Sequence, residues 1–145
     1  MRNILIAVSI VVLLAGFAGC GSLRHPKAGE FLEQAKGASG IDTQINLTKM
    51  IDASITSIQG DKYSEAGLDT LHNQLYALKK ASCDVTEAQA KTVAYAKAGT
   101  LQKEIRTIFH RLWKAKDNPA LRDAHLDLLA KRVQELRETL QAAKG

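Results

Sequence analysis

Apolar residues recur every three or four positions along most of the chain, and this spacing constrains the fold most. Leu68, Leu71, Leu75 and Leu78 are separated by three, four and three residues, which places them along one side of a helix. A longer stripe with the same period precedes them: Ile41, Ile45, Thr48, Ile51, Ile55 and Ile58, flanked by Leu47 and Met50. Both stripes predict amphipathic helices.

Two further stripes complete the pattern. Thr86 and Gln89 have the spacing of a capping box, and small or aliphatic residues then recur at helical spacing up to Trp113. Asn118 followed by Pro119 is a typical helix start. The apolar face of this last helix is expected to comprise Leu121, Leu128, Leu129, Val133, Leu136 and Leu140.

The four helices are expected at about residues 42–59, 62–82, 86–113 and 119–143. Short loops between them make sequential helices antiparallel neighbours. A β sandwich would need more turn signals and aromatic residues, whereas this chain has two prolines and only 5% aromatic residues. We therefore expect an all-α fold, an antiparallel four-helix bundle-like domain over residues 41–145.

The amino terminus has a different composition. Met1, Arg2 and Asn3 form a short positive start, and residues 4–18 are then almost all apolar or small, with no charge. A bilayer-spanning helix needs about 20 apolar residues, so this run is short for a permanent anchor. It has the length of a signal-peptide core.

The run ends in Phe17, Ala18, Gly19 and Cys20, which resembles the lipobox of bacterial lipoproteins. The resemblance implies that signal peptidase II removes residues 1–19 and that the Cys20 thiol carries a diacylglycerol, usually with an acylated amine. Two or three acyl chains make a stable membrane anchor, whereas a single chain holds only marginally. The alternatives are an uncleaved membrane helix and a plain signal peptide cut elsewhere.

Residues 20–40 are expected to form the lipidated tether. They contain Pro26 and four glycines, which interrupt regular structure, although a short helix over about residues 27–36 fits the pattern. Residue 21 is Gly, and the enteric sorting rule retains lipoproteins with Asp at this position in the inner membrane. In a Gram-negative host we therefore expect the outer membrane, with the domain facing the periplasm.

Cys83 is the only cysteine besides Cys20. If Cys20 is thioether-linked, the two cannot form a disulfide with each other. We expect Cys83 as a small buried hydrophobic residue near a helix end, with an intermolecular disulfide as the alternative.

The most distinctive local stretch is basic and contains the single tryptophan. It includes His110, Arg111, Trp113, Lys114 and Lys116, which are candidates for contact with anionic headgroups or an acidic partner. In the alternative, Phe109 and Trp113 belong to the core and the charges are solvated. Residues 103–145 carry ten Lys and Arg against six Asp and Glu, most of the excess in a net charge of +5.

Catalytic and cofactor motifs are not found in the sequence. His110 and His125 flank the last turn, with Asp127 nearby, but a metal site needs convergent ligands, and surface histidines are the simpler interpretation. The chain has no c-type haem motif, nucleophile motif or glycine-rich phosphate loop. We expect no catalytic residue, no metal and no cofactor.

Together these patterns predict a membrane-anchored cell-envelope lipoprotein. We expect a non-enzymatic accessory or scaffold subunit, held to the membrane by lipid on Cys20, that binds another envelope protein. Nucleic acid is not an expected partner, because export removes the chain from the cytoplasm. The alternative is a helical bundle that binds a small ligand or haem in the periplasm.

Overall fold

The computed structural model describes residues 25–144, which are helical and contain no strand. The predicted leader, Cys20 and the first residues of the tether lie outside the described residues. The helices are α1 (Ala28–Gln34), α2 (Gly40–Ser57), α3 (Glu65–Ala81), α4 (Glu87–Ala90), α5 (Val93–Lys114) and α6 (Pro119–Lys144), with a 3-10 turn, η1 (Gly60–Lys62). Each helix among residues 25–144 is too short or too polar to span a bilayer.

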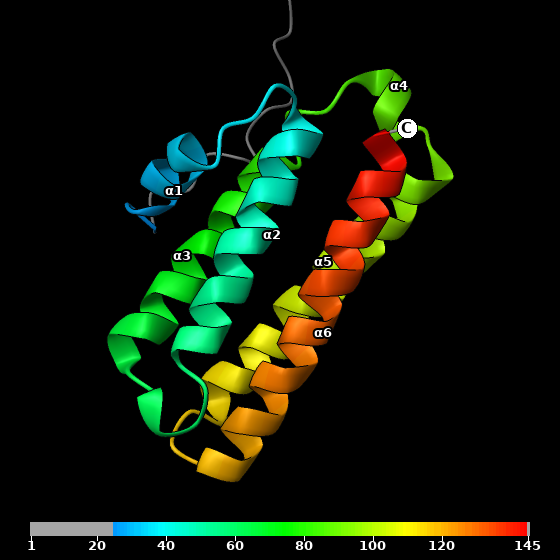
Figure 1. Ribbon diagram of the computed structural model, residues 1–145. Helices are drawn as coiled ribbons and strands as arrows, with labels where there is room; N and C mark the ends of the chain where they lie inside the picture. Colours follow the sequence, from blue (N-terminus) through cyan, green and yellow to red (C-terminus); the bar gives the residue numbers. More distant parts are fainter. Residues whose placement is uncertain (1–24, 145) are drawn as a thin grey trace, which may run out of the picture.

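The long helices form two hairpins. Figure 1 shows α2 and α3 side by side with their connection at one end of the molecule, and α5 and α6 side by side with their connection at the same end. The hairpins pack together mainly through α2 and α6, whereas α3 and α5 approach each other far less. The seam between α3 and α5 is therefore packed more loosely than the seam between α2 and α6.

Side chains at the helix starts account for the boundaries. The hydroxyls of Ser39, Ser64 and Thr92 each accept a hydrogen bond from a backbone N–H in the first turn of α2, α3 and α5. The Asn118 side chain does the same for Leu121 N–H, at 3.2 Å. Such caps satisfy donors that have no partner within the helix.

Two glycines are required by the backbone. Gly60, in the connection between α2 and α3, has a φ of 61°, a conformation that most residues avoid. Gly40 begins α2 beside the segment after α3, and a Cβ there would clash with the Asp84 carbonyl oxygen. This contact brings the start of α2 close to the end of α3.

The core is continuous from α1 to α6. The predicted isoleucine stripe of α2 and the leucine seam of α3 are both buried, as expected. α1 packs mainly against α3, with Ala28 and Ala35 buried. The largest fully buried side chains are Ile41, Leu47, Ile51, Ile55, Ile58, Leu68, Leu71, Ile105, Leu112, Leu126, Leu129 and Leu136. Within residues 25–144, the buried apolar residues lie between positions 28 and 140.

The prediction of one helix over residues 86–113 is wrong. The capping box of Thr86 and Gln89 is present, but α4 ends after four residues and Thr92 caps a new helix. Thr92 has an extended backbone, with φ −73° and ψ 146°. α4 buries no residue, so no packing holds it in line with α5.

The predicted apolar face of α6 is partly wrong. Leu121 and Leu128 are 53% and 38% exposed, whereas Leu126, absent from the predicted face, is fully buried. The buried stripe runs through Leu126, Leu129 and Val133, and Leu121 and Leu128 lie on a neighbouring face of the helix, seven residues apart.

Candidate binding groove between α3 and α5

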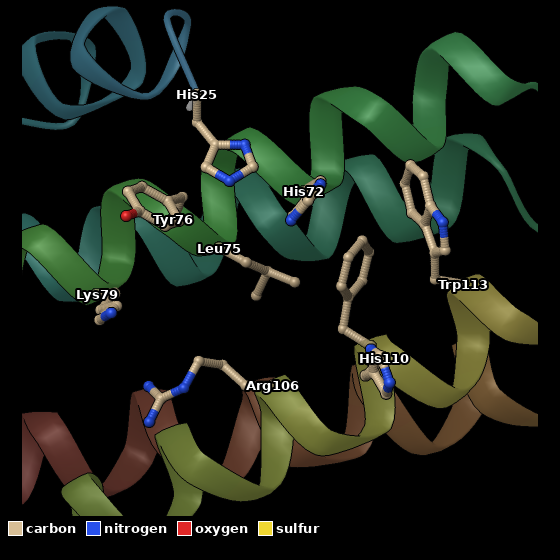
Figure 2. Close-up of a pocket in the computed structure, with 9 residues that line it drawn as sticks. His25, His72, Leu75, Tyr76, Lys79, Arg106, His110 and Trp113 are labelled. Carbon is tan, nitrogen blue, oxygen red and sulfur yellow. The ribbon is translucent and has the colours of Figure 1, made fainter. Parts of the chain in front are cut away.

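A groove of about 470 Å³ lies along the loose seam between α3 and α5. Figure 2 shows the side chains that line it. They are His25, His72, Leu75, Tyr76, Lys79, Arg106, Phe109, His110 and Trp113. Its volume falls in the range of small-molecule sites.

Each wall is one face of a helix over two turns. α3 contributes His72, Leu75, Tyr76 and Lys79, and α5 contributes Arg106, Phe109, His110 and Trp113. Both sets have the spacing i, i+3, i+4 and i+7, which places side chains along one stripe of a helix. Seven residues correspond to about 10.5 Å of helix, so the walls match in length.

Aromatic rings bridge the two walls. The His72 ring centroid lies 5.0 Å from that of Phe109 and 5.4 Å from that of Trp113. His25, just before α1, lies 4.3 Å from both His72 and Tyr76. Phe109 is nearly buried, at 7% exposed, whereas Trp113 is 40% exposed. The floor is therefore packed while the Trp113 end remains open to solvent.

The electrostatics of the groove favour anions. Lys79 and Arg106 extend from opposite walls at the end away from Trp113 (Figure 2), and the nine lining residues include no Asp or Glu. Partial burial lowers the pKa of His72, proximity to His25 lowers it further, and Asp69 opposes the shift. His72 is therefore neutral at pH 7, and the fixed charges belong to Lys79 and Arg106.

The structure divides the basic stretch predicted from the sequence. His110 and Trp113 line the groove, whereas Arg111 lies beside Leu128 and Arg132 in a shallow depression between α5 and α6. Lys114 is exposed. Lys116 forms an ion pair with Glu65 at the start of α3. The five residues therefore do not form one surface.

Five residues of the groove were missed by sequence reasoning, and one of them, Arg106, lies on α5. His25, His72, Tyr76 and Lys79 come from the segment before α1 and from α3. His72, Tyr76 and Lys79 have i, i+4 and i+7 spacing. This spacing could have indicated that they share one face of a helix. The missing information was that α5 lies opposite with the same spacing.

The histidine pair considered for a metal does not converge with further ligands. His110 lies in the groove, whereas His125 is half-buried on α6. Within residues 25–144, no group of three or more His, Cys, Asp or Glu side chains is placed to hold a metal ion.

Cys83 lies just beyond the end of α3 and is exposed. Its predicted burial is therefore wrong, because the last buried residue of α3 is Ala81. Cys83 belongs to a disulfide, and the other cysteine of the chain, Cys20, lies outside the described residues.

Comparisons with known proteins give no relative for this chain. It matches no protein-family model, no curated protein sequence and no solved structure.

Proposed function

We propose that the chain is a membrane-anchored lipoprotein of the cell envelope, non-enzymatic, that serves as an accessory or scaffold subunit by binding another protein. The apolar leader and the Phe17–Cys20 motif support the anchor. His25 is five positions after Cys20, and five residue steps reach about 18 Å when fully extended. A lipid on Cys20 would thus hold the helical unit close to the membrane surface, on the periplasmic side of an outer membrane in a Gram-negative host.

The disulfide of Cys83 competes with this anchor, because Cys20 is the only other cysteine of the chain. A thioether on Cys20 and a disulfide between Cys20 and Cys83 exclude each other, because each uses the same sulfur. Cys20→Ser behind a leader that signal peptidase I removes tests the anchor: we expect the wild-type chain in the membrane fraction and this variant released by osmotic shock. Equal release of both chains would contradict a lipid anchor.

One observation supports the proposal that this chain binds another protein. Leu121 and Leu128 share a face of α6 and remain exposed, and Leu128 lies with Arg111 in a depression of about 390 Å³ between α5 and α6. Arginine is enriched at partner interfaces, and exposed apolar side chains beside it offer surface that a partner would bury. We place the contact with the partner protein here.

Photo-crosslinking in cells tests this surface. A benzophenone amino acid at position 128 is expected to give one discrete protein adduct, which Arg111→Ala weakens. The matched control is position 138, since Glu138 is also exposed on α6 but lies outside the depression. The same adducts from both positions, or adducts with abundant porins alone, would contradict a specific partner at this face.

The second candidate function is binding of a small ligand or haem, and the groove between α3 and α5 favours it. A neutral histidine is the form that ligates haem iron, and His72 lies among aromatic rings with two cations at one end of the groove. Titration with hemin should produce a shifted Soret band that His72→Ala abolishes. No spectral change, or the same change in the variant, would exclude haem.

We also propose that α2, α3, α5 and α6 form an antiparallel four-helix bundle that is open along one seam. Three closely packed pairs of helices support this arrangement: α3 with α2, α2 with α6, and α6 with α5. The groove would occupy the remaining seam, between α3 and α5. Cysteines replacing Leu75 and Phe109, which line opposite walls of the groove, should then be joined by a flexible bismaleimide in a chain without native cysteines, and no crosslink would contradict this arrangement.

A further inference from the structure

The groove between α3 and α5 has two chemically different ends. At one end, Lys79 from α3 and Arg106 from α5 extend from opposite walls. An ammonium and a guanidinium on facing walls form a charge-assisted clamp for a carboxylate or a phosphate. The lining residues include no acidic side chain to compensate them.

The rest of the groove is apolar and aromatic. Leu75 points into the space between the helices, and Trp113 stands at the end away from the cations (Figure 2). Phe109 also lines the groove and is buried. The pKa of His72, among these rings, is lowered chiefly by burial, so its side chain adds no charge to this part at neutral pH. An alkyl chain or a ring system would bury apolar surface here.

The dimensions fit a small molecule with an acid at one end. The lining residues extend over two turns of each helix, about 10.5 Å, and the volume is about 470 Å³. A partner helix would need a longer surface for a stable interface.

We propose that this groove binds a single-chain anionic amphiphile. Its carboxylate or phosphate lies between Lys79 and Arg106, and its apolar chain lies over Leu75, Phe109 and Trp113. Both a free fatty acid and a lysophospholipid carry this chemistry. The inference goes beyond the proposed protein-binding function and deepens the second candidate by naming its ligand class. It concerns a different surface from the one beside Leu128.

The position of the groove gives it access to such ligands, a point that depends on the proposed anchor. His25 lines the groove and is five residues from Cys20. With Cys20 lipidated, this tether keeps the groove within about 18 Å of the lipid attachment point, where amphiphiles released from the bilayer are concentrated.

Binding can be measured without the anchor. The chain from residue 20 with Cys20→Ser contains all the buried apolar residues of the described part, which lie between positions 28 and 140, and circular dichroism verifies its helicity. Trp113 is the only tryptophan, so its fluorescence reports on the groove. Dodecanoate, kept below its micelle concentration, should give a saturable change, whereas dodecyltrimethylammonium should bind at least about tenfold more weakly.

Matched variants test the proposed clamp. Lys79→Gln and Arg106→Gln should each weaken dodecanoate binding by about tenfold or more. Lys103→Gln and Lys114→Gln remove exposed charges of α5 outside the groove. Each should change the affinity for dodecanoate by less than about twofold. Calorimetry provides a readout independent of the fluorophore.

Comparison of lysophosphatidylglycerol with dodecanoate separates the two sources. Tighter binding of lysophosphatidylglycerol than of dodecanoate identifies a lysophospholipid, and the reverse order identifies a fatty acid. Equal affinity for anionic and cationic amphiphiles, or affinities unchanged in both Lys79→Gln and Arg106→Gln, would overturn the proposal. Because the tested chain lacks the lipid and retains Leu128, this failure would leave the anchor and the protein partner untouched.

Discussion

The imidazole rings of His25 and His72 lie with their centroids 4.3 Å apart, joining the segment before α1 to the middle of α3. Partial burial and then the proximity of His25 lower the pKa of His72 in the folded chain. The unfolded chain, with an ordinary histidine pKa near 6.5, therefore takes up a proton more readily than the folded chain.

This difference predicts a pH-dependent stability. The contribution of a neutral His72 is fully present above the unfolded pKa and is lost as pH falls through about 6.5 towards the lower folded pKa. Urea unfolding between pH 8 and pH 5 should show falling stability, with a smaller fall in His72→Gln. Equal slopes in wild type and His72→Gln would contradict the prediction.

Two adjacent leucines of α6 should respond very differently to truncation. Leu129 is fully buried and Leu128 is 38% exposed. We expect Leu129→Ala to reduce the free energy of unfolding by about 2–5 kcal/mol and Leu128→Ala by less than about 0.5 kcal/mol. Chemical denaturation of both variants measures the difference, and similar losses would show that the rotation of α6 about its axis is wrong.

The break between α4 and α5 predicts unequal effects at two threonine caps. Thr92 caps the 22-residue α5, whose buried face is part of the core, whereas Thr86 caps α4, which buries nothing. Thr92→Ala should lower the free energy of unfolding by about 1 kcal/mol. Thr86→Ala should lower it by much less, because α4 can fray without exposing the core. Equal losses would indicate one continuous helix.

A buried amide pair connects α2 with α5. Gln102 Nε2 donates to Gln44 Oε1 at 2.8 Å, and Gln44 Nε2 donates to the Tyr95 hydroxyl at 3.3 Å. Gln102→Leu leaves the Gln44 oxygen without this donor and should cost about 1–3 kcal/mol. In a double-mutant cycle, adding Gln44→Leu should recover part of that loss. Additive losses would show that the pair is not coupled.

The spacing of apolar residues was sufficient to predict the helices whose buried stripes consist of large aliphatic side chains. The isoleucines of α2 and the leucines of α3 have one spacing and a single buried face, so their helices were predicted to within about three residues. The stripe through Ala90 and Ala94 contains only small side chains, which bury little on any face. It therefore carried no information on the break at Thr92.

The groove was only half visible in the sequence. The stretch around Trp113 attracted attention because basic and aromatic residues are adjacent there. However, adjacent residues on a helix point in different directions, which is why Arg111 lies away from the groove. Its other wall comes from residues more than 25 positions earlier, and no local pattern indicates which faces of two helices meet.

The central claim is that a lipid on Cys20 anchors this helical protein to a membrane, and intact mass spectrometry of the chain purified from membranes tests it most directly. We predict a polypeptide that begins at residue 20 and carries the added mass of a diacylglycerol, with or without an amide-linked acyl chain. A chain that retains Met1, an unmodified Cys20, or a peptide joining Cys20 to Cys83 would contradict it.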